Sequence, residues 1–441
     1  MSETGIRRAL RQPMFRLELL AYSLVSASMG VATVVVSVAL FRRGGTTLWA
    51  TVGVVSRVAP FVLFSAFSGA IADRFDQRRV LQWAFAAQVV VAGLLAATVS
   101  SAPLLVVALI GFVGQTAWTI AYPSMAALLP RAVDRDDLAA ANGLLSTVES
   151  LAWIAGPGLG GLVVTAAGML PTVGVEAGLA TLGLVLATAA LRSGRRGAVP
   201  VAEPYAPTVR AERERLVDSV LDGIRTVRAT PAVHHPLALL LVSNVVYGAL
   251  QVLMLVVAWK RLGMSEGGYG ALCAGLGAGA FAALLAVRPA GGFVRADLVL
   301  AGSVLLGGVP LALLAIASAP AVGIVLLGVS GLGLVLTEVL ALTAVQQHLP
   351  ADRIAGVFGL LDSSTVAAML IGSVVVGPVI SLAGLEVALV AVGALMPLAA
   401  VITVPRLVRW RAARAMPAHD VQVIAGGSSP GAAVRNFTLN R

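Results

Sequence analysis

Long apolar intervals separated by short polar segments run through most of the chain. Crossing a membrane takes a helix of about 20 apolar residues, and each interval has the length of one or two such helices. Gly, Pro and Ser interrupt the longer intervals near their middle. The pattern predicts helices at residues 19–41 and 49–72, at 80–130 with a break at 100–103, at 138–191 with a turn near 169–171, at 237–259 and 269–287, at 298–349 with a break at 319–320, and at 354–404 with a break at 383–384.

Two stretches of the chain are similar to each other. Residues 143–168 read GLLSTVESLAWIAGPGLGGLVVTAAG and residues 359–384 read GLLDSSTVAAMLIGSVVVGPVISLAG, so that Gly161 aligns with Gly377. Small residues let neighbouring helices approach closely, and a Pro in an apolar helix is tolerated where other helices satisfy the freed carbonyl group. The repeat predicts an all-α integral membrane protein with twelve transmembrane helices in two six-helix halves, in which these stretches are packing elements.

Polar segments divide the chain into an N-terminal segment, two halves, a linker and a tail. The predicted boundaries are residues 1–18, 19–191, 192–236, 237–405 and 406–441. The linker carries apolar side chains at helical spacing, which indicates either an amphipathic helix on the membrane surface or a plain linker helix. These side chains are Val217, Val220, Leu221, Ile224 and Val227. The tail is rich in Arg, Gly, Ser and Ala and is expected to be disordered.

The amino-acid composition excludes several classes of protein. Of 441 residues, 58% are hydrophobic and 12% are charged, whereas soluble domains carry about 25% charged residues. Cys273 is the single cysteine and the four histidines lack helical ligand spacing, so the sequence predicts neither a disulfide nor a metal site. It also contains no glycine loop for a nucleotide. We therefore expect a membrane protein that is not an enzyme and binds no cofactor.

The net charge of +10 is distributed unevenly along the chain. With the N-terminus inside the cell, every basic residue lies in a cytoplasmic segment except Arg42, Arg43, Arg57, Lys260 and Arg261. Positive residues favour cytoplasmic loops and attract anionic lipid headgroups. The charges predict a multi-pass protein of the cytoplasmic membrane with both termini in the cytoplasm, and they favour lipid contact over nucleic-acid binding. The two outer pairs follow the first helix of each half, which agrees with the repeat.

Four charged side chains fall inside predicted helices, namely Arg57, Glu149, Glu338 and Asp362. A charge within a membrane costs roughly 2.5–3.5 kcal/mol on insertion scales, so such residues are functional candidates. Carboxylates shielded from water bind protons more readily, which suits a proton-coupled transporter. An ion pair or a position near the headgroups is the alternative for each. Acids at the ends of predicted helices are expected to face water, namely Glu18, Glu176, Asp297 and Glu386.

The segment between the second and third predicted helices, residues 69–79, reads GAIADRFDQRR. It resembles the loop signature of the major facilitator superfamily, G-x-x-x-D-R-x-G-R-R, with Asp76 in place of the second glycine and Gln77 in place of an arginine. Its D-R-F-D-x-R-R form resembles the bacterial drug and siderophore exporter branch, the transmembrane secretion effectors. The resemblance implies a conformational switch formed by Gly69, Asp73, Arg74, Arg78 and Arg79. The corresponding segment of the second half, residues 288–292, has no acid.

The apolar stretch GPGLGG in the fifth predicted helix also resembles a signature of that superfamily. The pattern G-P-x-x-G-G is associated with antiporters, and Gly156, Pro157, Gly160 and Gly161 match it, whereas Ala152 replaces a further expected glycine. The upstream segment RAVDRDDLAAANGLL is also similar to the exporter branch. Close helix packing without any meaning for the direction of transport is the alternative explanation of these glycines.

Polar and aromatic side chains share one helical face in two of the predicted helices. Spacing of i, i+3 and i+7 presents them together, which suits a large amphiphilic or aromatic substrate. Hydrogen bonding between helices is the alternative role. The sets are Gln115, Trp118 and Tyr122 in the fourth helix and Asn244, Tyr247 and Gln251 in the seventh.

The resemblance implies the major facilitator fold, with a central cavity between two halves and alternating access by rocking. It also implies proton-coupled export of a small hydrophobic or amphiphilic compound, such as a drug, siderophore or secondary metabolite, by a monomer. Many members of the superfamily place an acid midway along the first helix, where this chain has Ser26, Met29, Gly30 and Thr33. That departure leaves open a non-transporting lipid-binding or regulatory protein, and an importer of the same fold is a further alternative.

Overall fold

The structure, a computed structural model, describes residues 3–134, 137–194, 225, 227, 230–265, 267–286, 296–349 and 351–415. Every element within these residues is a helix. In chain order they are α1 (Glu3–Arg11), α2 (Pro13–Gly44), α3 (Thr47–Arg74), α4 (Gln77–Thr98), α5 (Leu104–Thr119), α6 (Ala121–Ala132), α7 (Leu138–Ala167), α8 (Met169–Gly194), α10 (Pro231–Val256), a π-helical turn (Val257–Arg261), α11 (Gly268–Ala286), α12 (Ala296–Leu313), α13 (Pro320–His348), α14 (Ala351–Ala383) and α15 (Leu385–Ala415).

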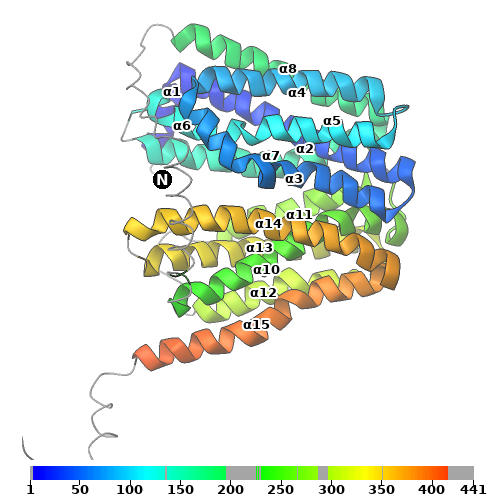
Figure 1. Cartoon of the computed structure of the whole chain (residues 1–441), viewed down its shortest axis with the longest axis vertical. Coiled ribbons are helices and arrows are strands. Elements are labelled where there is room, and N and C mark those ends of the chain that lie inside the picture. Colours follow the sequence, from blue (N-terminus) through cyan, green and yellow to red (C-terminus); the bar gives the residue numbers. More distant parts are fainter. Residues whose placement is uncertain are drawn as a thin grey trace, which may run out of the picture.

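The helices form two groups that lie side by side (Figure 1). In the N-terminal group, α1 to α8, the first long helix α2 packs against α7 and α8, and α4 packs against α5 and α8. In the C-terminal group, α10 to α15, the helix α10 packs against α14 and α15, and α13 packs against α11 and α12. Most helix axes run across the view of Figure 1, and the N-terminus lies at one end of them.

The surface of both groups suits a lipid environment. Eleven helical segments are long and apolar enough to cross a membrane, and α12 contributes a shorter apolar segment, Val299–Leu313. Large apolar side chains point outward on many of these helices; Val90 and Leu94 on α4 are 61% and 47% exposed, and Val401 on α15 is 72% exposed. Surface of this kind is expected where lipid, rather than water, surrounds a protein.

The breaks between helices fall where the sequence pattern predicts them. Gly168 ends α7 with φ 85° and Gly384 ends α14 with φ 91°, and the two glycines occupy aligned positions of the repeat. Gly45 after α2 has φ 67°, and Gly263 after the π-helical turn that extends α10 has φ 57°. Glycine adopts this left-handed conformation without the steric cost that other residues incur. The turns that reverse the chain are therefore built in the same way in both groups.

Two arginines make equivalent contacts in the two groups. Arg43, in the last turn of α2, donates to the carbonyl oxygens of Val99 and Ala102 in the loop between α4 and α5. Arg261, after α10, donates to the carbonyl oxygen of Ala317 in the loop between α12 and α13. These loops correspond to each other in the repeat. The outer basic pairs identified in the sequence thus hold matching loops through backbone carbonyls.

The aligned glycines Gly156 and Gly372 also make matching contacts. A Cβ atom on Gly156 of α7 would lie 2.7 Å from the carbonyl oxygen of Ala27 and 2.8 Å from the Cα atom of Gly30, both on α2. A Cβ atom on Gly372 of α14 would collide with the carbonyl group of Val245 on α10. Each repeated stretch therefore packs backbone against backbone on the first long helix of its own group.

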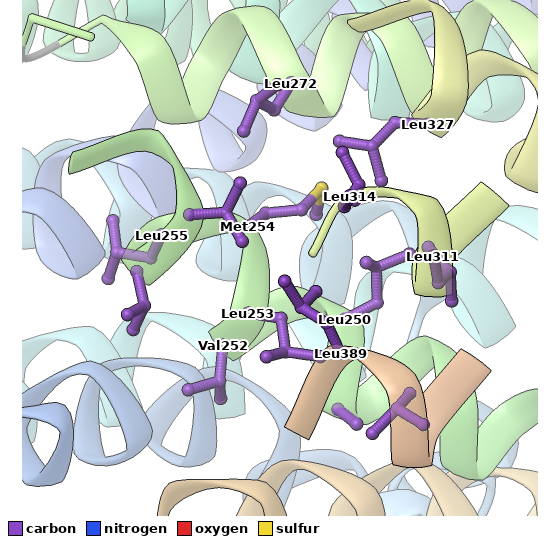
Figure 2. Close-up of a cluster of buried hydrophobic side chains, with 14 of the residues drawn as sticks. Leu250, Val252, Leu253, Met254, Leu255, Leu272, Leu311, Leu314, Leu327 and Leu389 are labelled. Carbon is purple, nitrogen blue, oxygen red and sulfur yellow. The ribbon is translucent and has the colours of Figure 1, made fainter. Parts of the chain in front are cut away.

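Leucine packing fills the centre of the C-terminal group around α10. Leu250 and Leu253 are fully buried there. Figure 2 labels Leu250, Val252, Leu253, Met254 and Leu255 of α10 together with Leu272, Leu311, Leu314, Leu327 and Leu389 from the elements around it. Lipid tails are as apolar as leucine, so these contacts stabilise the group mainly through close van der Waals packing.

The sequence pattern does not predict α1 or the division of the fourth predicted helix at Ile120. Pro123 accounts for the division, because it lacks an N–H group and its ring disfavours the preceding helical turn. Helix α1 is too short for a hydropathy signal; an ion pair between Arg8 Nη2 and Asp137 Oδ1, 3.0 Å apart, holds it against the start of α7. Asp137 is buried.

Several helices run beyond the predicted limits of the linker and tail. Helix α8 continues to Gly194, α10 already begins at Pro231, and α15 continues to Ala415. The predicted amphipathic linker helix lies outside the described residues except for Val227, and the tail beyond Ala415 also lies outside them.

The contact at Gly156 generates a stability prediction. A Gly156→Ala variant must push α7 away from the α2 backbone, so we expect it to lose about 1–3 kcal/mol despite its better helix propensity. Gly174→Ala on α8 is the matched control, because a Cβ atom there meets nothing within 4 Å. Thermal unfolding of the purified protein in detergent measures both. Equal or higher melting temperature in Gly156→Ala than in the control would contradict the described packing.

Candidate functional site

The two helix groups meet at the end remote from the N-terminus (Figure 1). A Cβ atom on Gly161 of α7 would lie 2.6 Å from the Cα atom of Gly270 on α11, and one on Gly377 of α14 would collide with the Thr51 side chain on α3. Gly161 and Gly377 are aligned in the repeat and lie near the last turns of their helices. Gly270 and Thr51 lie near the first turns of theirs. The interface between the groups thus contains two equivalent glycine contacts, which lie at one end of the molecule.

Apolar side chains close this end of the molecule. Val34 of α2 and Val54 of α3 belong to the same buried cluster as Leu253 and Tyr269 of the C-terminal group. The rings of Phe41 on α2 and Trp259 after α10 also pack across the interface, with centroids 5.4 Å apart. Water and solutes are therefore excluded where the groups meet.

The glycines of the antiporter-like stretch face two different partners. Gly156 and Pro157 pack against Gly30 of α2, and Gly160 packs against Val31 of the same helix. Gly161 instead faces α11 of the other group. The stretch joins the interior of the N-terminal group to the interface between the groups. Both the predicted packing role and a role in conformational change are compatible with this placement.

Glu149 is the acid whose surroundings are best defined. It is half-buried on α7, and its Oε1 atom accepts a hydrogen bond of 3.2 Å from the hydroxyl group of Tyr22 on α2. Tyr22 is fully buried, and its ring packs on Trp118 of α5 with centroids 5.2 Å apart. The buried aromatic pair holds the phenol in place, so it presents a fixed donor to the carboxylate.

The predicted set in the fourth helix does not share one environment. Gln115 and Trp118 on α5 are buried, at 3% and 4% exposure, whereas Tyr122 on α6 is 44% exposed. The break at Ile120 separates them. The Gln115 Nε2 atom is buried without a hydrogen-bond partner in the described structure. Trp118 packs against Tyr22. Of this set, Tyr122 has the most accessible side chain.

The predicted set in the seventh helix, on α10, divides in a similar way. Asn244 donates to the carbonyl oxygen of Leu240 in its own helix. Gln251 accepts a hydrogen bond of 3.4 Å from the Tyr269 hydroxyl group, which links α10 to α11. Tyr247 is half-buried, and Cys273, Gln251 and Glu338 lie around its hydroxyl group. Gln251 therefore has the interhelical role given as the alternative, while Tyr247 lies beside an acid.

Glu338 and Glu149 occupy comparable depths in the two groups. Glu338 is exposed on α13, near the middle of a helix that the sequence predicts to span the membrane. Like Glu149, it lies on the side toward the N-terminus and away from the contacts at Gly161 and Gly377. Glu149 and Glu338 are thus accessible acids well inside membrane-length helices, one in each group, on the side where the described glycine contacts between the groups are absent.

Arg57 ties three helices of the N-terminal group together. From α3, its Nη2 atom donates to the carbonyl oxygen of Met29 at 3.0 Å and to the Thr33 hydroxyl group at 3.2 Å, both on α2. Its Nη1 atom lies 3.4 Å from the carbonyl oxygen of Gly111 on α5. The side chain is 7% exposed, and its Nε atom has no partner in the described structure.

The loop between α3 and α4 is ordered around Asp76. Its side chain caps α4 by accepting from the backbone N–H of Arg78 at 3.1 Å, as preferred at helix N-termini. This capping role explains why an aspartate stands where the signature has a glycine. Arg78 is half-buried against Met14, and Arg79 is exposed. The side chains of Gly69, Asp73 and Arg74 lie outside the described part, as does that of Asp362.

Two of the acids expected in water are buried, so that expectation is wrong for them. Glu18 on α2 and Glu176 on α8 are each 1% exposed, and the Oε2 atom of each has no partner in the described structure. Glu386 is 59% exposed and lies 3.6 Å from Arg261, as expected near water. The side chain of Asp297 is outside the described part. Helix α2 begins at Pro13, six residues before the predicted start, so Glu18 lies inside the helix. Hydropathy also does not report how deeply neighbouring helices cover an acid such as Glu176.

Three participants in these contacts, Tyr22, Tyr269 and Glu176, are absent from the candidates derived from sequence. Glu176 had a usable signal, since it is an acid within the apolar interval 138–191. The tyrosines had none, because their role depends on which helices are neighbours. Among the described residues, no group of three His, Cys, Asp or Glu side chains could hold a metal ion.

The arrangement of helices is similar to that of solved transporters. A POT family transporter in complex with a thioalcohol-conjugated peptide matches with a TM-score of 0.69 and 11% identity over 89% of this chain and 96% of that chain. A bacterial homologue of the human lysosomal transporter Spinster, inward-facing and unoccupied, matches with a TM-score of 0.64 and 12% identity over 90% of this chain and 97% of that chain. At such identities the likeness shows the fold alone.

Sequence comparison supplies the family. No curated protein matches the chain. Residues 7–423, which is nearly the whole chain, match the family described as transmembrane secretion effector. The structural matches are transporters of the major facilitator fold, which agrees with that assignment. The chain therefore belongs to the transmembrane secretion effector family, within the major facilitator superfamily.

Proposed function

We propose that this membrane transporter exports a small hydrophobic or amphiphilic compound in exchange for protons. The observation that carries the proposal is the Glu149 carboxylate, half-buried within a membrane-length helix and held by the Tyr22 hydroxyl group. A carboxylate in such a place gains or loses a proton as its surroundings change between water and apolar contacts. The family description, transmembrane secretion effector, supports the outward direction.

The proposed architecture is twelve transmembrane helices in two six-helix halves, with α12 as the span added to the eleven longer ones. The matching contacts of Arg43 and Arg261 and of the aligned glycines support it. The positive-inside bias supports cytoplasmic termini and a location in the cytoplasmic membrane, with basic residues against anionic headgroups. The proposed transporter acts as a monomer. In that orientation the groups meet outside, so the conformation is inward-facing.

In the proposed cycle the closed outer end opens as the two halves rock. Glu149 and Glu338 lie on the cytoplasmic side of the contacts, one in each half, where a solute entering from the cytoplasm reaches them. Tyr247 offers aromatic surface near Glu338, and Tyr122 offers it near Tyr22, the hydrogen-bond partner of Glu149, for an amphiphilic solute. Proton binding neutralises the carboxylate of an acid. The free-energy cost of enclosing that side chain when the halves close is then lower.

An importer of the same fold is the second candidate. Two solved relatives of this fold are POT family transporters, one in complex with a thioalcohol-conjugated peptide and one with 5-aminolevulinic acid. The fold thus serves polar cargo as well. Direction is decided by measuring whether the solute accumulates inside cells or is depleted from them when the protein is expressed. A non-transporting membrane protein produces neither change.

Removing the charge of either accessible acid tests the coupling. We expect Glu149→Gln or Glu338→Gln to abolish proton-driven efflux of a fluorescent dye from cells, because the variant side chain cannot exchange a proton. Glu386→Gln is the matched control, since this acid is exposed at the start of α15 and should retain efflux. Efflux that survives in both Glu149→Gln and Glu338→Gln would contradict the assignment of these acids.

The contact at Thr51 and Gly377 allows a direct test of alternating access. A Cβ atom on Gly377 would lie 3.4 Å from the Thr51 Cβ atom, close to the spacing of a disulfide. In a Cys273→Ser background, which removes the native thiol, we expect Thr51→Cys with Gly377→Cys to cross-link on oxidation, to stop transport, and to regain it on reduction.

Each single-cysteine variant serves as the control for this cross-link and should remain active after oxidation. A fully cross-linked double variant that still transports at the original rate would show that the end carrying Gly377 does not open during the cycle.

A further inference from the structure

The buried acid Glu176 has no role in the proposed cycle. Among the described acids of the N-terminal group, Glu176 and Glu18 are the most deeply buried. Its side chain is 1% exposed and its Oε2 atom lacks a hydrogen-bond partner in the described structure. Arg57, which is also buried, has an Nε atom in the same condition. Charged groups buried in protein normally pair or form hydrogen bonds, so both side chains retain unused binding capacity.

Packing along α2 places Glu176 at the level of Arg57. Gly183 of α8 faces Ala21 and Val25 of α2, and Val173 of α8 belongs to the same cluster as Val31. Glu176 lies between these two positions on α8, so it is level with the middle turns of α2. Those turns carry Met29 and Thr33, the groups to which Arg57 donates. Two buried groups of opposite charge at one level attract each other more strongly than they would in water.

Among the described side chains, Arg57 is the charged group that the packing places level with Glu176, and the Tyr269 hydroxyl group of α11 is a further titratable group near Arg57. Helices α2, α4 and α7 pack against α8. The side chains of α2 and α4 that cluster with Val173 are apolar, including Val35, Val91 and Leu95. Glu149 is the charged residue within α7, and it lies nearly two turns before Gly156, which packs on α2 at Ala27 and Gly30.

The second half of the chain indicates that the fold does not require these charges. In the register that aligns Gly168 with Gly384, Glu176 corresponds to Val392, which is buried on α15. Thr51 on α3 and Gly270 on α11 contact aligned glycines, so α3 and α11 occupy equivalent places. On that basis Arg57 corresponds to residues 273–276 of α11, which contain no charged side chain. The same scaffold is thus built with neutral residues, and the charged pair is specific to the N-terminal group.

We propose that Glu176 is a proton-binding site of this transporter, with Arg57 as its counter-charge, separate from Glu149 and Glu338. The proposal rests on proton-coupled transport and adds a site to it. The proton binds at the carboxylate, whose Oε2 atom is unpartnered, and leaves from the same atom. The deprotonated carboxylate attracts Arg57 and competes with the groups on α2 and α5 for its N–H donors, whereas the neutral acid leaves Arg57 bonded to them.

The position of Arg57 connects this site to the interface between the groups. Met29, which accepts from Arg57, precedes Gly30, and Gly30 packs on Gly156 of α7. One and a half turns further along α7, Gly161 touches Gly270 of the other group. Release of Arg57 from α2 therefore acts on the helix that carries the contact between the groups.

Infrared spectroscopy tests proton binding without requiring transport. With the full chain in lipid vesicles, the carbonyl absorption of protonated carboxyl groups is recorded during titration from acid to alkaline buffer. We expect Glu176→Gln to lose one component of the wild-type difference spectrum, distinct from those lost in Glu149→Gln and Glu338→Gln. The exposed Glu386→Gln variant is the control and should leave that component in place. A Glu176→Gln spectrum identical to wild type would overturn the proposal.

A second measurement tests the pairing of Glu176 with Arg57, and it remains informative if Glu176→Gln folds poorly. Arg57→Gln leaves Glu176 without a counter-charge, so its melting temperature should fall, and adding Glu176→Gln should raise it again because no unpaired acid remains. Losses that simply add in the double variant would refute the pairing. Glu176→Asp keeps the carboxyl group and is expected to retain the infrared component at a shifted frequency.

Transport measurements separate this proposal from the proposed function. In vesicles, we expect Glu176→Gln to lose the dye efflux that a proton gradient drives. Exchange of dye between the two sides of the membrane, which needs no gradient, should continue. Unchanged gradient-driven efflux in this variant would overturn the role of Glu176. Absence of any dye movement in the wild type would refute export of that dye, and the infrared and melting measurements would still decide whether Glu176 and Arg57 form a proton site.

Discussion

Contact between helix backbones at glycine is the interaction on which the rest of the structure depends. Gly156 lies against Gly30 within the N-terminal group, and Gly161 lies against Gly270 between the groups. A side chain at any of these positions would separate helices that otherwise touch through their main chains. Because lipid provides little hydrophobic drive for helix association, close van der Waals contact of this kind has a large share in holding such a protein together. The same helix, α7, therefore sets both the packing of its own group and the closure against the other.

Charge placement is the second constraint, and the two halves treat it differently. The aligned stretches keep their glycines but not their acids, since Glu149 has Thr365 at the matching position. The N-terminal group encloses Arg57, Glu149 and Glu176, whereas the C-terminal group carries Glu338 at its surface. Two groups of helices with matching contacts thus carry different distributions of ionisable side chains.

Sequence patterns predicted the helices and their breaks well because hydropathy and glycine positions report directly on membrane spans and turns. They also predicted the repeat, which the matching contacts of Arg43 and Arg261 support. Burial was predicted poorly. Glu176 looks like a helix-end acid until α2 and α4 are seen to cover it, and Tyr22 acquires meaning only through its contact with Glu149. The periodicity of a single helix does not show which other helices it will pack against. The partners of these residues therefore could not be derived from residue spacing alone.

The hydrogen bonds of Arg43 and Arg261 have a mechanical consequence. Each arginine holds a loop of its own group, so separation of the two groups in the proposed cycle would leave these bonds intact. What is lost on separation is mainly contact between small and apolar side chains at the closed end. Such a joint is stiff within each group and weakly bonded across the boundary. In the proposed cycle, such a joint would part and re-form without breaking the hydrogen bonds that shape its two sides.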